Sequence, residues 1–85
     1  MILVELFSKE DCHLCDVAME VIIRLQKTYP FNLNVIKIRE GDEHHQQMKD
    51  RIPVVYINKE FAFQCRIPEE EFVRKLRNAS PTAQQ

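Results

Sequence analysis

The sequence predicts an α/β domain built on a four-stranded mixed sheet with helices on both faces. Its 85 residues leave room for one hydrophobic core. Near the N-terminus, two strand-like segments flank a helix-length segment, and strands joined in that way are parallel. Near the C-terminus, two strand-like segments flank a short turn and form an antiparallel hairpin. We expect one domain over residues 1–78, in the order β-α-β-α-β-β-α, and a flexible tail over residues 79–85.

The first strand and the first helix have clear patterns. Ile2 to Phe7 is a short apolar run rich in strand-forming residues, and a polar loop from Ser8 to Asp11 follows it. From Cys12 to Tyr29, the charged residues follow a helical spacing of four, four and three and form a single stripe: Asp16, Glu20, Arg24 and Lys27. The spacing favours an ion pair between Glu20 and Arg24. Pro30 ends this helix.

The middle of the chain predicts a second strand and a short helix. Leu33 to Arg39 has apolar side chains on both faces, which is typical of a strand covered on two sides. Asp42 to Asp50 is polar and only weakly amphipathic, and Met48 is its one strongly apolar residue. We therefore expect only a short helix there.

The C-terminal third predicts a hairpin. Val54 to Ile57 and Glu60 to Cys65 are the two strands, and Asn58-Lys59 is the turn, because asparagine tolerates positive φ. Alternation along the second strand places Phe61, Phe63 and Cys65 on one face, so we expect Cys65 to lie in the core.

A final helix follows the hairpin. Pro68 suits the first position of a helix. Its first turn is acidic from Glu69 to Glu71, and its last turn is basic at Arg74, Lys75 and Arg77, so these charges complement the helix macrodipole.

Composition and charge exclude several classes of function. Twelve Lys and Arg against thirteen Asp and Glu leave a net charge of −1, which argues against a nucleic-acid partner or an anionic membrane surface. The apolar N-terminal run lacks the basic flank of a signal peptide and is too short to span a membrane. Three cysteines cannot all pair within one chain, so this is not a disulfide scaffold. We expect a cytoplasmic monomer in a reducing compartment, where a Cys-x-x-Cys pair is typically catalytic or metal-binding.

Cys12 and Cys15 form such a pair at the expected start of the first helix. Unpaired N–H groups and the helix dipole stabilise an anion at this position by roughly 0.3–2 kcal/mol. We therefore expect a lowered pKa for the Cys12 thiol. Cys15 lies one helical turn further in, where it can attack a mixed disulfide formed on Cys12. This exchange chemistry needs no bound cofactor. Lys9 and His13 are the nearest residues that can add positive charge.

Arg51-Ile52-Pro53 immediately precedes the hairpin. The proline cannot donate to a strand ladder, and with a cis peptide bond the backbone of Ile52 would turn outward and pair with an extended substrate. Arg51 could meet a substrate carboxylate.

These features resemble glutaredoxin-like proteins of the thioredoxin superfamily. The resemblance rests on Lys9 three residues before the Cys-x-x-Cys pair, on Ile52-Pro53 before a Val-Val-Tyr-Ile strand, and on the hairpin and final helix. It extends from residue 1 to about 78 and is closest to small bacterial glutaredoxin-like proteins. It implies a thioredoxin fold, a cis bond before Pro53, Cys12 as nucleophile and Cys15 as resolving thiol. It also implies that Lys9 lies near a carboxylate of glutathione.

The sequence departs from typical glutaredoxins at three places. His13 and Leu14 replace the Pro-Tyr between the two cysteines, and Arg51-Ile52-Pro53 replaces Thr-Val-Pro. Residues 64–66 replace a Gly-Gly stretch that lets glutathione approach the backbone. The substrate that the resemblance implies is a disulfide-containing protein or a glutathione mixed disulfide, with glutathione as a possible co-substrate. The candidate substrate contacts are Lys9, His13, Arg51, Ile52 and Pro53.

Two other functions compete with thiol-disulfide exchange. One is a binding module that keeps the fold but does little turnover. The other is a metal or iron-sulfur carrier through Cys12 and Cys15, to which His44 and His45 could add ligands. Adjacent histidines on a helix point about 100° apart, however, and seldom reach one metal ion. We therefore assign no metal ligands. Glu5 could act as a proton acceptor for Cys15, but a position at the rim of the fold is the simpler interpretation.

Overall fold

The computed structural model describes residues 2–43 and 45–79 and has the predicted element order. Strands β1 (Leu3–Ser8), β2 (Asn32–Lys37), β3 (Val54–Ile57) and β4 (Glu60–Gln64) form one sheet in the order β2-β1-β3-β4. β1 is parallel to β2 and antiparallel to β3, and β3 is antiparallel to β4. The predicted four-stranded mixed sheet is therefore confirmed.

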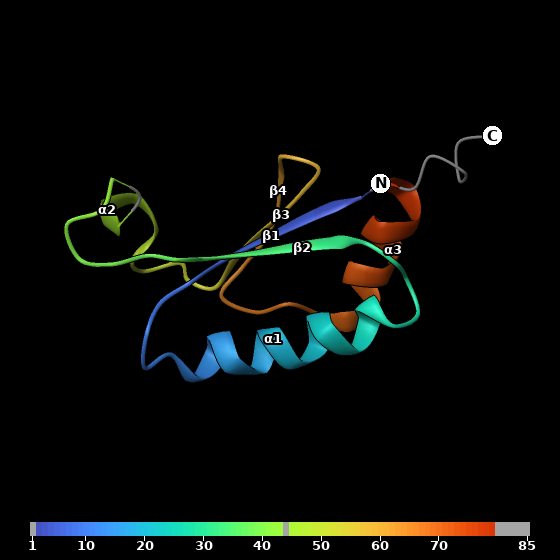
Figure 1. The fold of residues 1–85 in the computed structure, drawn as a ribbon, viewed down its shortest axis with the longest axis horizontal. Helices are drawn as coiled ribbons and strands as arrows, with labels where there is room; N and C mark the ends of the chain where they lie inside the picture. The colour runs from blue at the N-terminus through green and yellow to red at the C-terminus, as the bar shows by residue number, and fades with distance from the viewer. Residues whose placement is uncertain (1, 44, 80–85) are drawn as a thin grey trace.

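The helices differ in how much of the sheet they cover (Figure 1). α1 (His13–Gln26) runs along one face, α3 (Glu69–Ala79) packs at one end of it, and α2 (His45–Met48) is a single turn beyond the other end. α3 includes Ala79, which we had assigned to the tail, and residues 80–85 lie outside the described part of the chain. No helix among the described residues is long and apolar enough to cross a membrane.

The main core lies between the sheet and the two longer helices. Phe72 of α3 is fully buried, and its ring stacks on that of Phe63 of β4, with the centroids 5.9 Å apart. Apolar side chains at alternate positions of β1 and β3 meet one face of α1 here, as the two periodicities require. The buried members from these elements are Val4, Leu6, Ala18, Ile22, Leu25, Val55, Ile57 and Leu76.

Arg24 forms an ion pair that joins the two longer helices, and its partner differs from the predicted one. The sequence predicts a pair between Glu20 and Arg24 within α1, but the Arg24 guanidinium bonds to the Glu69 carboxylate of α3. The end of α1 and the start of α3 therefore meet at the surface. Spacing along one helix did not reveal this partner because the second helix brings its own carboxylate closer.

The prediction that the second strand is covered on both faces is wrong. β2 is the edge strand next to β1, and most of its residues are exposed. Val35 is 37% exposed although its neighbour in the ladder, Leu6, is fully buried. α1 packs over the core and covers only part of the edge strand β2. Within the predicted strand Leu33 to Arg39, only Ile38, just after β2, is buried.

The prediction that Phe61, Phe63 and Cys65 share one face is also wrong. A register shift in the β3–β4 ladder pairs Val55 with Phe63 but Tyr56 with Phe61, so that Ala62 is an extra residue. Phe61 is consequently 51% exposed, whereas Phe63 is buried. Cys65 follows the strand in a left-handed conformation and is half-buried, so it is not the core cysteine we expected.

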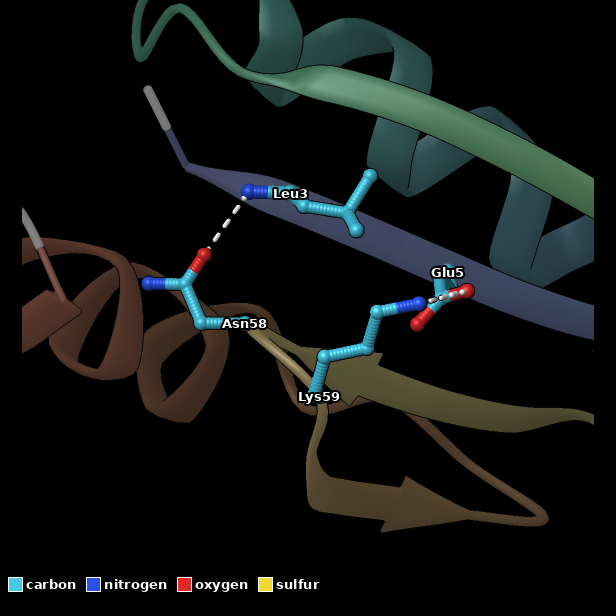
Figure 2. Close-up of polar contacts among 4 residues, drawn as sticks. All are labelled: Leu3, Glu5, Asn58 and Lys59. Atoms are coloured by element: carbon cyan, nitrogen blue, oxygen red, sulfur yellow. Dashed lines mark hydrogen bonds and ion pairs between the residues drawn. The ribbon is translucent and has the colours of Figure 1, made fainter.

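The hairpin turn is anchored to the beginning of β1 (Figure 2). Asn58 has a positive φ, as the sequence predicts, and Lys59 has one as well. The Leu3 N–H donates to Asn58 Oδ1 at 2.9 Å, and the Asn58 N–H donates to the Leu3 carbonyl at 2.8 Å. Lys59 Nζ donates to Glu5 Oε2 at 3.2 Å. Glu5 is thus paired with the hairpin rather than with Cys15.

We predict that Asn58→Ala destabilises the protein by about 1–2 kcal/mol, because it removes the side-chain hydrogen bond and disfavours the left-handed backbone. Urea unfolding measures the change. Asn34→Ala is the matched control, since Asn34 is exposed on β2, and should change stability by less than about 0.5 kcal/mol. Equal effects of the two substitutions would contradict the role given to Asn58.

Candidate active site

The loop between β1 and α1 presents Cys12 at the helix N-terminus. Asp11 has a φ of 53°, which asparagine and aspartate tolerate better than most residues, and it turns the chain into the helix. Cys12 is the N-cap residue, with an extended backbone at φ −116° and ψ 104°. The first helical residue is His13. The sulfur of Cys12 therefore lies where backbone N–H groups have no partner within the helix.

One of these N–H groups reaches the sulfur. The Cys15 N–H donates to Cys12 Sγ at 3.2 Å, which is the contact that a serine or aspartate oxygen makes in most N-caps. A hydrogen bond to the charged form of an acid stabilises that form. The local geometry therefore favours a thiolate on Cys12 when the protein is reduced.

Cys12 and Cys15 are joined as a disulfide, with their Cα atoms 5.2 Å apart. This separation is within the ordinary range for disulfides, so the helix turn accommodates the bond. The two sulfurs differ in access. Cys12 is half-buried, whereas Cys15 is only 5% exposed. Cys12 is therefore the more accessible of the two sulfurs.

A second, smaller apolar cluster buries Cys15. Met48 of α2, Ile52, Val54 and Ile38, which follows β2, belong to the same cluster, and all are buried. Cys12, Phe7 and Tyr56 pack against this cluster. The Cys-x-x-Cys pair and the Ile52-Pro53 segment, which are far apart in the sequence, therefore meet here. Sequence reasoning did not place Met48 in this cluster, although its position as the one apolar residue of a polar segment was a usable signal.

The Ile52–Pro53 peptide bond is cis, as the resemblance implies. The backbone around it is already engaged. The N–H groups of Arg51 and Ile52 donate to the Met48 carbonyl at 2.8 and 3.1 Å. The Cys65 N–H is shared between the carbonyls of Arg51 and Pro53 at 3.0 and 2.8 Å. The Ile52 side chain is buried and its N–H is bonded within the fold, whereas substrate contacts by Ile52 and Pro53 stay predictions.

The other three candidate substrate contacts, Lys9, His13 and Arg51, lie in different surroundings. Lys9 is exposed and lines a cavity of about 430 Å³ together with Cys15, Asp16 and Lys37. His13 is exposed in the first turn of α1. The Arg51 guanidinium is bonded to the Gln47 carbonyl, to which its Nε and Nη2 donate at 3.1 and 2.8 Å. Substrate contacts by Lys9, His13 and Arg51 stay predictions.

The metal-carrier alternative receives no ligand cluster from the described residues. Within residues 2–43 and 45–79, no group of three or more His, Cys, Asp or Glu side chains is arranged to hold a metal ion. His44 lies outside the described residues, so metal binding by His44 and His45 stays a prediction.

Comparison with known proteins gives one family match. Residues 3–77 match the family model described as Glutaredoxin-like domain (DUF836). No curated protein matches the sequence.

Several solved structures share the fold. Protein Ne2328 from Nitrosomonas europaea is 26% identical, with a TM-score of 0.74 over 87% of this chain and 89% of that chain. A structure described as a malarial protein is 14% identical, with a TM-score of 0.69 over 93% of this chain and 97% of that one. Thioredoxin O2 from Arabidopsis thaliana, in its oxidised state, is 17% identical, with a TM-score of 0.60 over 92% and 73%. The chain therefore has a thioredoxin-like fold.

We predict that Met48→Val makes Cys15 more accessible, because it removes side-chain volume from the apolar cluster that buries this cysteine. In the reduced protein, the rate of alkylation at Cys15 relative to Cys12, measured by mass spectrometry, should rise several-fold. Leu25→Val is the control: Leu25 is similarly buried but belongs to the main core. Each substitution should cost about 1–2 kcal/mol of stability. A similar rise in both variants would assign the effect to general loosening of the fold.

Proposed function

Because the chain belongs to the Glutaredoxin-like domain (DUF836) family, we propose that it is a thiol-disulfide oxidoreductase that uses Cys12 and Cys15. One observation carries the proposal. The two sulfurs are within bonding distance at the N-terminus of α1, where Cys12 can be reached and Cys15 is buried. This asymmetry supports Cys12 as the nucleophile and Cys15 as the resolving thiol.

In the first step, the Cys12 thiolate attacks one sulfur of a substrate disulfide. A Cys12–substrate disulfide forms, and the other substrate sulfur leaves as a thiolate that takes up a proton. The Cys15 N–H supports this step because it already points at Cys12 Sγ. The N-terminus of α1 adds its positive end.

In the second step, Cys15 loses its proton and attacks Cys12 Sγ. The Cys12–Cys15 disulfide forms, and the second substrate thiol is released, so the substrate has gained two electrons and two protons. A low-molecular-weight thiol such as glutathione, or a dithiol reductase, would then return the pair to the reduced form. The substrate would be a protein disulfide or a glutathione mixed disulfide. We further propose that the protein works as a monomer in the cytoplasm.

We predict that Cys12→Ser abolishes turnover of a glutathione mixed disulfide, because Cys15, the other thiol at this helix end, is buried. Cys15→Ser should keep part of this activity, because removal of glutathione from a mixed disulfide needs only the nucleophile, and a second thiol from solution can finish the reaction. Reduction coupled to NADPH through glutathione reductase measures both rates.

Cys65→Ser is the control for this experiment, and it should retain activity because Cys65 takes no part in the disulfide. Loss of activity in both active-site variants would indicate a mechanism that requires two thiols. A purified protein that carries stoichiometric metal and resists alkylation at both cysteines would favour the carrier function instead.

We predict that the pKa of the Cys12 thiol in the reduced protein lies below the value of about 8.5 for a free cysteine, because the Cys15 N–H and the helix N-terminus stabilise the thiolate. Alkylation reports the thiolate, so at neutral pH Cys12 should react faster in the folded than in the urea-denatured protein. Its rate should fall about tenfold per pH unit below the pKa. Identical pH profiles for the folded and denatured protein would leave no activated nucleophile and favour the binding-module interpretation.

A further inference from the structure

A cavity of about 430 Å³ borders Cys15 between the start of α1 and the end of β2. Its opening is lined by charged residues, all of them exposed, so the cavity is open to solvent. These residues are Lys9, Glu10 and Asp11 of the loop after β1, Asp16 of α1 and Lys37 of β2. Cys15, although only 5% exposed, therefore borders a space that water can enter.

Ser8, at the end of β1, is the buried polar residue of this cavity. No other polar or charged side chain that the structure describes is buried. The Ser8 hydroxyl makes no hydrogen bond to another described residue. Because no fully enclosed side-chain oxygen or nitrogen in the described part of the chain lacks a partner, Ser8 Oγ keeps access to the cavity that the residue lines. A buried hydroxyl without a protein partner is typically bonded to water, and a cavity of this size holds several water molecules.

The other surroundings of Cys15 offer its proton no comparable route in the second exchange step. The other buried members of the apolar cluster have no side-chain group that accepts a proton. Cys12, which packs against that cluster, carries the substrate during this step. Cys12 does not line the cavity, so a substrate bonded to it need not fill this space. The cavity therefore remains as the polar side of Cys15 when its thiol must ionise.

We propose that the proton of Cys15 leaves through this cavity, by way of a water molecule that Ser8 Oγ holds beside the thiol. Ser8 is thus a positioning residue for the second exchange step. The Cys15 S–H bond breaks, and the water takes the proton and passes it to solvent. The sulfur electron pair then forms the bond to Cys12 Sγ, and the substrate sulfur leaves as a thiolate that takes up a proton. The inference rests on the proposed thiol-disulfide exchange and adds the residue that assists its second step.

The charges around Cys15 make Ser8 a clean position to test. The two lysines at the cavity opening favour a thiolate on Cys15, and the three carboxylates there oppose it. Tyr56 of β3 and Cys12 pack against the apolar cluster, to which α2 contributes the uncharged Met48. Serine carries no charge, so its replacement leaves this balance unaltered. A change in rate on replacing Ser8 therefore reports the loss of its hydroxyl.

The test separates the two exchange steps in the full chain with Cys65→Ser, so that Cys12 and Cys15 are the only thiols. The reduced protein is mixed with an excess of the symmetrical disulfide of thionitrobenzoate. Attack by Cys12 releases the first thionitrobenzoate, and attack of Cys15 on Cys12 Sγ releases the second, at a rate independent of the probe concentration. Stopped-flow absorbance measures both phases as a function of pH. Cys15→Ser in the same chain should release only the first, which assigns the second phase to Cys15.

Ser8→Ala should slow the second phase about fivefold, the effect of losing one hydrogen bond of ordinary strength, and leave the first phase unchanged. The pH midpoint of the second phase should move upward, because the water that stabilises the thiolate loses its anchor. Ser8→Thr keeps the hydroxyl and should restore both the rate and the midpoint. Tyr56→Phe is the matched control: it also removes a hydroxyl from a residue packed against the cluster of Cys15, but Tyr56 does not line the cavity, so neither phase should change.

Three outcomes would overturn the role of Ser8. They are an unchanged second phase in Ser8→Ala, equal slowing of both phases, and a Ser8→Thr variant as slow as Ser8→Ala. The same loss in Tyr56→Phe as in Ser8→Ala would overturn the route through the cavity. A parent chain that releases no thionitrobenzoate, or only the first equivalent, would instead contradict the proposed function, so the two failures can be distinguished.

Discussion

The sulfur of Cys12 replaces the usual oxygen at the N-cap of α1, and the chemistry of the site depends on this contact. The Cys15 N–H that points at Cys12 Sγ belongs to the same residue whose side chain completes the disulfide. In the proposed reaction, one residue therefore contributes a hydrogen bond to the nucleophile and a thiol to the second step. Because both groups lie within one helical turn, no distant segment of the chain is needed to align the two sulfurs.

The asymmetry between the two cysteines has a different origin, because it depends on segments far away in the sequence. α2 is a single turn with little intrinsic stability. It is held by the Arg51 guanidinium, which bonds the Gln47 carbonyl, and by two N–H groups that bond the Met48 carbonyl. These contacts hold Met48 in the apolar cluster that contains Cys15. A short, poorly helical segment is thus fixed against the cluster that buries Cys15.

Local patterns were sufficient for much of this structure and failed where distant segments meet. The element order, the Asn58-Lys59 turn and the N-terminal position of Cys12 depend on neighbouring residues, and all were predicted. The exposure of Phe61 depends on an extra residue in a ladder, which alternation within one strand cannot reveal. The partner of Arg24 comes from another helix, and the donors to the Met48 carbonyl depend on how the chain folds back after α2. Such contacts are set by tertiary packing.

The bonded N–H of Ile52 limits how a substrate would be recognised at the cis-proline segment. An extended peptide that pairs with a strand edge normally uses both donors and acceptors of the edge. Here the Ile52 N–H is bonded to the Met48 carbonyl, and Pro53 has no N–H, so these two residues offer no backbone donor to an incoming peptide. Backbone pairing there would use acceptors alone, and a single backbone hydrogen bond contributes little net affinity. Under the proposed function, recognition of a substrate must therefore come mainly from side chains.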